Sequence, residues 1–305
     1  MSESPVGHDD DELSGEEAVA LLKDFDFSKN HLGTPGPNGE LVSTWLLTAG
    51  IVVKLIGYTC GSDAPPSEPF MMNFVASHTS IPVPKVRGVV SWDDSWWLFM
   101  DYIEGVDMSV AWPMLSAEAR DDVAQTLHNY ILQLRAINLP HPNTPGPING
   151  TGKPLPCIGR YFTEDNAGPF PTYEEMSAWY AAKHRVAEAA FKLHQTADYP
   201  YTSSNLTFDA SFPLVLTHAD ISLGNVVLGK DGKVWLIDWE RCGAYPQWFE
   251  YSGIKAYEDH SNIPESWLQL APVIAGDYSE QHQFLREIDI ALTMYSHTED
   301  PGPHY

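Results

Sequence analysis

The sequence contains Val215-Leu-Thr-His-Ala-Asp-Ile-Ser-Leu-Gly-Asn-Val-Val-Leu228 and, shortly after it, Val234-Trp-Leu-Ile-Asp-Trp-Glu240. Within these stretches Asp220 follows His218 by two residues, Asn225 follows Asp220 by five, and Asp238 ends an apolar strand. An Asp-x4-Asn pair alone is common. The full His-x-Asp-x4-Asn-x12-Asp-Trp-Glu string in a strand–loop–strand context is rare, so it indicates a functional site with a defined fold around it.

These residue types suit the transfer of a phosphoryl group. One carboxylate, expected to be Asp220, accepts or orients the proton of the attacking nucleophile. An amide and a second carboxylate, Asn225 and Asp238, are expected to hold Mg²⁺ against the phosphates, because this ion prefers hard oxygen ligands. We expect His218 to be a structural residue that hydrogen-bonds this loop rather than an acid or a base.

A site of this kind also needs a lysine for the phosphates and an acid that positions the lysine, both earlier in the chain. Lys54 closes an apolar run, and Glu68 stands at the beginning of the next expected helix, so these two fit the roles. The alternatives are an exposed lysine at a strand edge and an ordinary acid in a first helical turn. The sequence has neither a Gly-x-Gly-x-x-Gly loop near residues 33–50 nor an Asp-Phe-Gly triplet.

The first hundred residues predict a compact, mostly β unit. Short runs rich in β-branched and aromatic residues are typical of strands, and Asp93-Asp94 fits a hairpin turn. We expect the tryptophans at 92, 96 and 97 to pack rather than to stack on a ligand. The expected strands lie at 41–47, 51–55, 86–91 and 96–102, and the expected helices lie near 16–25 and at 70–77.

After residue 102 the pattern becomes helical. Ser116 can cap a long helix whose apolar residues recur at 123, 127, 131 and 134, and Thr172 with Glu175 forms a capping box for a second helix ending near 194. Strands are expected within 213–238, and helices follow from 248. Residues 138–172 hold eight Pro and five Gly, which predicts a functional loop or an insertion over the substrate side, without a packed core.

Composition narrows the class of partner. The 305 residues include 17 Lys and Arg against 41 Asp and Glu, a net charge of −24, which argues against nucleic acid and anionic membrane partners. Three scattered cysteines, Cys60, Cys157 and Cys242, argue against a disulfide framework or a zinc site. With no membrane-spanning run and no visible secretory signal, a cytoplasmic location is the default expectation.

The motifs resemble the aminoglycoside phosphotransferase and choline-kinase-related family, in which Asp-Trp-Glu, here at 238–240, replaces the Asp-Phe-Gly of protein kinases. The family usually has Gly at the position of Ala219, and a larger polar or basic residue is common where Gly224 stands. The likeness covers roughly residues 40–260. Further matching stretches are Phe74-Val75 through Thr79-Ser-Ile-Pro-Val-Pro84, Met100-Asp-Tyr-Ile-Glu-Gly105, Leu132-Gln-Leu-Arg-Ala-Ile137 and Tyr245-Pro-Gln-Trp-Phe-Glu-Tyr251.

This resemblance implies an α+β, protein-kinase-like two-lobed fold. We expect an acidic tail at 1–17, a small β-rich N-lobe that binds the nucleotide at 18–101, and a larger helical C-lobe at 102–305 with the catalytic loop, the metal site and the substrate-binding helices. It also implies ATP-dependent phosphoryl transfer to a hydroxyl group of a small molecule, with Asp220 as the catalytic base and Asn225 and Asp238 as Mg²⁺ ligands. The residues implied for nucleotide binding are Lys54, Glu68, Met100, Asp101, Tyr102 and Ile103.

Two other functions are compatible with the same motifs. A silent or repurposed member would bind a nucleotide or metabolite without transferring phosphate, although the complete set of site residues favours an enzyme. A protein kinase is disfavoured, because the Gly-rich loop and the Asp-Phe-Gly and Ala-Pro-Glu elements are absent from the sequence.

Overall fold

The computed structural model describes residues 12–32, 43–58, 66–163, 165–194, 205–256, 258–260 and 262–301. Its N-terminal part is a four-stranded antiparallel sheet with strand order β1-β2-β4-β3. The turn between β3 and β4 consists of Asp93 and Asp94, both with positive φ (51° and 56°), as a two-residue hairpin turn requires. The strands are β1 (Thr44–Thr48), β2 (Ile51–Tyr58), β3 (Val86–Trp92) and β4 (Ser95–Asp101).

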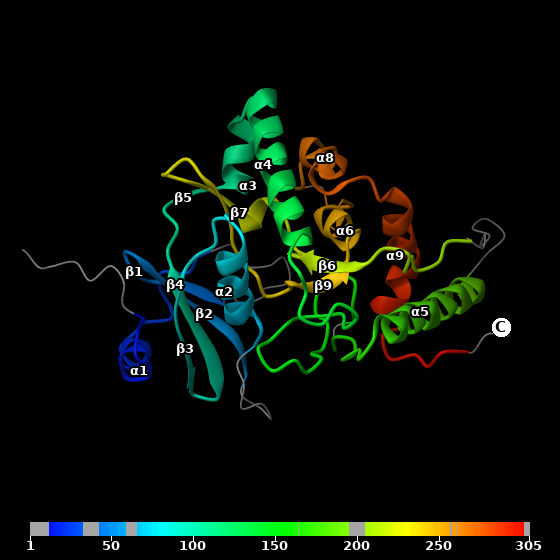
Figure 1. Cartoon of the computed structure of the whole chain (residues 1–305), viewed down its shortest axis with the longest axis horizontal. Helices are drawn as coiled ribbons and strands as arrows, with labels where there is room; N and C mark the ends of the chain where they lie inside the picture. Colours follow the sequence, from blue (N-terminus) through cyan, green and yellow to red (C-terminus); the bar gives the residue numbers. More distant parts are fainter. Residues whose placement is uncertain are drawn as a thin grey trace, which may run out of the picture.

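Helices α1 (Gly15–Lys23) and α2 (Glu68–His78) cover opposite faces of this sheet (Figure 1). Side chains of a strand alternate between its faces. Trp97 and Phe99 accordingly pack into a cluster with Leu22 of α1, whereas Leu98 packs with Met72 of α2. The ring of Trp97 also contacts those of nearby aromatic residues, so the packing role predicted for this tryptophan is confirmed.

The larger part of the chain is mainly helical, with two small sheets, β5-β7-β8 and β6-β9. Helices α5 and α9 lie side by side at the end of the molecule farthest from the four-stranded sheet (Figure 1). The elements are β5 (Gly105–Asp107), α3 (Met108–Ala111), η1 (Trp112–Met114), α4 (Ala117–Arg135), α5 (Tyr173–His194), β6 (Leu214–Thr217), η2 (Leu223–Asn225), β7 (Val226–Gly229), β8 (Val234–Leu236), β9 (Gly243–Pro246), α6 (Phe249–Lys255), α7 (Glu265–Leu268), α8 (Ala271–Ala275) and α9 (Ser279–Leu292).

Helix α4 begins where the sequence predicts, because the Ser116 side chain accepts a hydrogen bond from the backbone N–H of Ala119. The expected apolar stripe is buried, including Leu127 and Leu134. It contributes to one continuous core that also contains Met71 and Met72 of α2. The sheet and the helical part therefore share buried contacts, which fixes the walls of the site described below.

Two strands of the C-terminal part escape sequence-based prediction. Strands β5 and β9 are short, and each begins with a glycine that lies too close to neighbouring backbone to carry a side chain. A Cβ atom on Gly105 would lie 2.4 Å from the Leu228 carbonyl oxygen, and one on Gly243 would lie 2.6 Å from that of Gly146. Packing against a neighbouring strand or loop, rather than local propensity, selects these residues.

The expectation that residues 138–172 have no packed core is wrong. Tyr161, Phe162 and Phe170 are buried in a second cluster with residues of α5, α6 and α9. The backbone of Gly146 exchanges two hydrogen bonds with Ala244 of β9, at 2.9 and 2.8 Å. Aromatic side chains thus hold the described part of this proline-rich segment against the helical lobe.

The division of the chain into segments 1–17, 18–101 and 102–305 stays a prediction, although helix α1 already begins at Gly15, inside the expected tail. Cys157 and Cys242 are free and buried, while Cys60 lies outside the described residues. Among the described residues, no helix combines the length and the apolar character needed to cross a membrane.

Leu127→Ala should lower the free energy of unfolding by about 2–5 kcal/mol, because it leaves a cavity at a fully buried position of α4. Leu132→Ala, on the exposed side of the same helix, is the matched control and should change it by less than about 0.5 kcal/mol. Urea unfolding measures both. Equal effects would contradict the packing of α4.

Candidate active site

A cleft of about 490 Å³ lies between the four-stranded sheet and the hairpin β7–β8. This volume suits a small-molecule ligand. The cleft brings together residues that the sequence separates by almost two hundred positions. Its lining includes Thr44, Lys54, Met100, Asp101, Tyr102, Ile103, Asn225, Asp238 and Glu240.

Lys54 lies at the centre of the charged part of this cleft, with its side chain only 7% exposed. Its Nζ atom is 3.0 Å from Glu68, 2.6 Å from Asp238 and 3.3 Å from Glu240. Burial by itself would lower the pKa of Lys54, but the three carboxylates raise it above its usual value. The lysine therefore stays charged, and the alternative of an exposed strand-edge lysine is wrong.

Glu68 is buried in the first turn of α2, and it accepts a second hydrogen bond, 3.2 Å long, from the backbone N–H of Trp239. Burial raises the pKa of Glu68 to about 7, against the opposing effect of Lys54. Glu68 is thus more than an ordinary helix N-terminal acid, because it ties α2 both to β2 and to the segment after β8.

Asp238 follows β8 in a left-handed backbone conformation, with φ 65°. An aspartate tolerates this region better than most residues do, and such outliers concentrate at functional sites. Burial opposes the ionisation of Asp238, but Lys54 outweighs it and lowers the pKa of this carboxyl. The carboxylate is therefore ionised and faces the cleft.

Asp220 and Asn225 lie together on the loop after β6. The Asn225 amide nitrogen donates to the backbone carbonyl of Asp220 (2.8 Å) and to its carboxylate (3.0 Å). Arg241 donates to the other carboxylate oxygen at 2.8 Å. Burial raises the pKa of Asp220 to about 7, although Arg241 opposes this effect. Near neutral pH this carboxyl can therefore exchange a proton, which suits a general base.

The loop that carries Asp220 is held from behind by Glu250 of α6. The two carboxylate oxygens of Glu250 accept the backbone N–H groups of His218 (2.8 Å) and Ala219 (3.1 Å). His218 is fully buried, and its Nε2 atom lies 3.1 Å from the Ile237 carbonyl oxygen. Burial lowers the pKa of His218 to about 4, so the ring is neutral and links the two loops of the site.

The segment from Met100 to Ile103 forms one edge of the cleft. The backbone N–H of Asp101 donates to the carbonyl of Lys85, and that of Tyr102 donates to the carbonyl of Gly50. Among the loop, turn and cap hydrogen bonds of the described residues, none is donated by the N–H of Ile103. This N–H is therefore a candidate donor for a ligand at this edge of the cleft.

Carboxylate oxygens of Glu68, Asp238 and Glu240 lie within 4.8 Å of one another. The Lys54 ammonium contacts all three and is the cation that they share in this structure. Because the Asn225 nitrogen points toward Asp220, its amide oxygen remains as a further hard donor. The carboxylate of Asp238 and the amide oxygen of Asn225 are hard oxygen donors, which fit Mg²⁺ and do not fit soft metals.

Sequence reasoning assigned no role to three residues that the structure brings to the site. Glu240 and Arg241 directly follow Asp238-Trp239, and Arg241 reaches Asp220. Glu250 supports the loop from a helix that begins after β9. The signal for Glu240 was its place in the Asp-Trp-Glu motif, whereas the contacts of Arg241 and Glu250 depend on how distant segments pack.

Residues 64–275, more than half of the chain, match the model of the phosphotransferase enzyme family (APH). The chain therefore belongs to this family, and its fold is the α+β, protein-kinase-like two-lobed fold predicted from sequence. No curated protein matches the chain.

Three solved structures illustrate the structural likeness. The streptomycin–ATP–APH(2″)-IIa ternary complex is 14% identical to this chain, with a TM-score of 0.50. The match covers 91% of this chain and 86% of the chain in the complex. ADP-bound aminoglycoside phosphotransferase APH(2″)-Ib is 14% identical, with coverages of 94% and 93% and a TM-score of 0.49. Choline kinase LicA from Streptococcus pneumoniae is 13% identical, with coverages of 92% and 89% and a TM-score of 0.43. Identities this low indicate no substrate. Of the three structures, only the first has a TM-score of 0.50, and only this one supports the fold.

The pH dependence of stability should reveal the buried carboxyl of Glu250. Burial raises the pKa of Glu250 to about 7 in the folded protein, whereas the unfolded value is near 4.5. Folding therefore takes up a proton between these values, and this contribution to stability is lost as pH rises from about 4.5 through 7.

Glu250→Gln, which cannot ionise, should show a smaller fall in the free energy of unfolding over this range than the parent protein. Urea unfolding at closely spaced pH values measures the difference. Glu287→Gln on α9 is the control and should keep the parent slope. An identical slope for Glu250→Gln would mean that this carboxyl does not bind the proton on folding.

Proposed function

We propose that the protein is an ATP-dependent phosphotransferase that transfers the γ-phosphoryl group to a hydroxyl group of a small molecule, with Asp220 as the catalytic base. The observation that carries this proposal is that one cleft is lined by Lys54, Asp238 and Asn225. Lys54 is paired there with the buried Glu68, and the amide of Asn225 holds Asp220. A loose phosphoryl-transfer transition state needs mainly positioning and charge stabilisation, which such a set supplies.

Each group of the cleft has a place in this chemistry. The Lys54 ammonium, held by Glu68, would bind phosphate oxygens of ATP. Asn225 and Asp238, with Glu240 beside them, would hold Mg²⁺, which neutralises phosphate charge when bound. The backbone carbonyl of Asp101 and the N–H of Ile103 would pair with adenine, while Met100 lines the same cleft. Together these residues would form the nucleotide-binding part of the site.

Asp220 would act on the acceptor. Its carboxylate would orient the attacking hydroxyl and take its proton as the bond to phosphorus forms. Asn225 and Arg241 hold the two carboxylate oxygens at 3.0 and 2.8 Å, so the orientation is set before the acceptor binds. The proposed partner is thus a small-molecule alcohol, and the cytoplasmic location expected from sequence stays a prediction.

Asp238→Ala should abolish the Mg²⁺-dependent increase in melting temperature that ATP produces, because it removes an anionic metal ligand from the cleft. The apo protein should remain folded by circular dichroism. Asp231→Ala, which removes an exposed carboxylate from the turn of the same β7–β8 hairpin, is the matched control and should keep the full shift. A full shift in Asp238→Ala would remove Asp238 from the metal role.

Asp220→Asn should fold and bind Mg-ATP normally, since the amide keeps the shape of the carboxylate. Its turnover on the acceptor should fall by roughly 10²–10⁴, the range typical of losing a general base. Lys54→Ala should instead weaken nucleotide binding, so calorimetric titration with Mg-ATP and a turnover assay separate the two defects. Near-parental turnover by Asp220→Asn would favour a repurposed binding protein.

A further inference from the structure

The helix that carries Glu68 contacts the proline-rich segment as well as the cleft. Phe70 lies two residues after Glu68 in the first turn of α2. It is 36% exposed, whereas Met71 and Met72 are buried. A Cβ atom on Gly150 would lie 3.3 and 3.7 Å from two carbons of the Phe70 ring. Gly150 of the proline-rich segment therefore lies directly against α2.

Phe70 begins a row of rings along one face of α2. The rings of Phe70 and Phe74 are stacked, with centroids 6.0 Å apart, and the Phe74 centroid lies 4.3 Å from that of His78. Residues four apart share one face of a helix. Phe74 is partly buried and packs against the core that α2 shares with the helical lobe. The Phe70 ring is therefore held against its own helix, and a contact with it bears on α2 as a whole.

The turn that brings Gly150 to the Phe70 ring is fixed by its own hydrogen bonds. The side-chain oxygen of Asn149 accepts the backbone N–H of Thr151 at 3.0 Å and its hydroxyl at 2.6 Å. Just before this turn, Ile148 packs against the same core as α2. The φ of Gly150 is not positive, and the atoms nearest to a Cβ at this position belong to Phe70. A residue larger than glycine would therefore meet the ring without straining the backbone.

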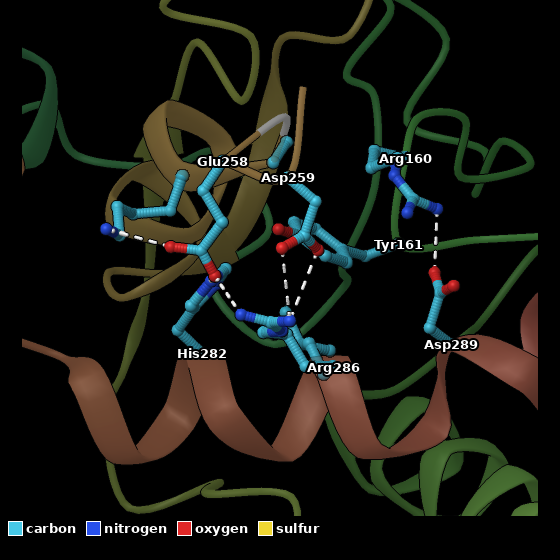
Figure 2. A pocket seen from close by; sticks show the side chains of 10 residues that line it. Arg160, Tyr161, Glu258, Asp259, His282, Arg286 and Asp289 are labelled. Carbon is cyan, nitrogen blue, oxygen red and sulfur yellow. Dashed lines mark hydrogen bonds and ion pairs between the residues drawn. The ribbon is translucent and has the colours of Figure 1, made fainter. Parts of the chain in front are cut away.

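The far end of the proline-rich segment is held by the helical lobe. A pocket of about 120 Å³ lies there beside α9, and its basic side chains are paired with its own carboxylates. Figure 2 shows one of these pairs, between Arg160 and Asp289 of α9, at 2.7 Å. The Tyr161 hydroxyl donates to the Ser252 carbonyl of α6, also at 2.7 Å. The segment is thus attached to α6 and α9 as well as touching α2.

The same segment borders the proposed catalytic base. A Cβ atom on Gly159 would lie 3.3 Å from the Arg241 side chain, and Arg241 donates to Asp220 at 2.8 Å. One segment of the helical lobe therefore contacts the partner of Asp220 and, through Gly150, the helix that carries Glu68.

The first turn of α2 is the part of the helix that such a contact affects most. Ser67, the residue before the helix, makes no side-chain hydrogen bond that caps it. Glu68 reaches Lys54 at 3.0 Å and the backbone N–H of Trp239 at 3.2 Å, so a tilt of this turn would lengthen both contacts. Kinase-type phosphoryl transfer requires that the lysine and the helix acid are paired. The position of the first turn therefore bears directly on the cleft.

We propose that Phe70 is a positioning residue: the contact between its ring and Gly150 sets the position of the first turn of α2, and thereby the position of Glu68 at Lys54. Phe70 is not among the residues that line the cleft, so it acts through Glu68. This assignment rests on the proposed phosphotransferase function, in which the Lys54–Glu68 pair binds the phosphates. The proline-rich segment then controls the geometry of the nucleotide side from the helical lobe.

Hydrogen exchange of the Trp239 backbone amide tests the proposal without nucleotide, because this amide donates to Glu68. The ¹⁵N-labelled full chain is transferred to D₂O and followed by NMR. Phe70→Ala should accelerate exchange at Trp239 by roughly five- to tenfold relative to the amide of Leu127 in α4, as expected for losing one aromatic contact. Phe70→Tyr keeps the ring and should keep the parent rate.

Gly150→Val tests the same contact from the other side. Its side chain would meet the Phe70 ring, displace the first turn of α2 and accelerate exchange at Trp239. Gly15→Val is the matched control, because a Cβ atom on Gly15 meets nothing within 4 Å, and it should keep the parent rate.

Calorimetric titration with Mg-ADP connects this positioning to the cleft. Phe70→Ala should weaken Mg-ADP binding by roughly fivefold in the parent chain but by less than about twofold when Glu68→Gln is already present, because two changes that act through one contact are not additive. A residue that only stabilises the fold would weaken binding equally in both backgrounds.

The proposal is overturned if Phe70→Ala accelerates exchange at Trp239 no more than at Leu127, or if Gly150→Val leaves Trp239 unchanged. It is also overturned if Phe70→Ala weakens Mg-ADP binding equally with and without Glu68→Gln. The exchange measurement involves no nucleotide. If Trp239 responds as expected but the parent chain does not bind Mg-ADP, Phe70 keeps its role in placing Glu68 and the phosphotransferase function is removed.

Discussion

The site depends on one buried ammonium group. Lys54 contacts carboxylates from α2 and from the segment after β8. Lys54 and Glu68 are both buried, so either of them would be an uncompensated charge in the interior without the other. The positive charge compensates Glu68, Asp238 and Glu240, and they in turn keep the lysine ionised. This arrangement joins the four-stranded sheet to the β7–β8 hairpin by charge, in addition to the apolar core that they share. The residues whose ion pairs join the walls of the cleft are therefore the same residues that are proposed to bind the phosphates and the metal ion.

A second constraint acts on the Asp220 loop, which has little regular structure. Its backbone N–H groups at His218 and Ala219 would lack partners if Glu250 did not accept both. His218, kept neutral by burial, connects this loop to the strand end before Asp238. Asp220 and Asp238 are thus held at fixed positions by groups that belong to neither residue's own segment. Such preorganisation is what phosphoryl transfer requires of a protein.

The charged groups of the pocket beside α9 are arranged differently from those of the cleft. The cleft gathers carboxylates around one lysine, whereas the pocket beside α9 pairs Arg160, Lys255 and Arg286 with Asp289, Glu258 and Asp259. The proline-rich segment joins the two regions, because Gly159 borders Arg241 and Arg160 lines the pocket. The segment that composition predicts to be a functional loop or an insertion therefore contacts Arg241 next to Asp220 and also lines this pocket.

The sequence alone determined most element positions, because apolar periodicity and caps such as Ser116 are local patterns. It also determined the fold class and most of the expected site residues, because the spacing from His218 to Glu240 carries a resemblance to a known family. Only the tertiary structure decided that Glu250 supports the Asp220 loop, that Arg241 binds Asp220, and that Arg160 and Arg286 share a pocket. These contacts join residues far apart in the chain or from packed helices, and no local pattern encodes them. Short strands such as β5 and β9 escaped for the same reason, since neighbouring backbone rather than propensity selects their glycines.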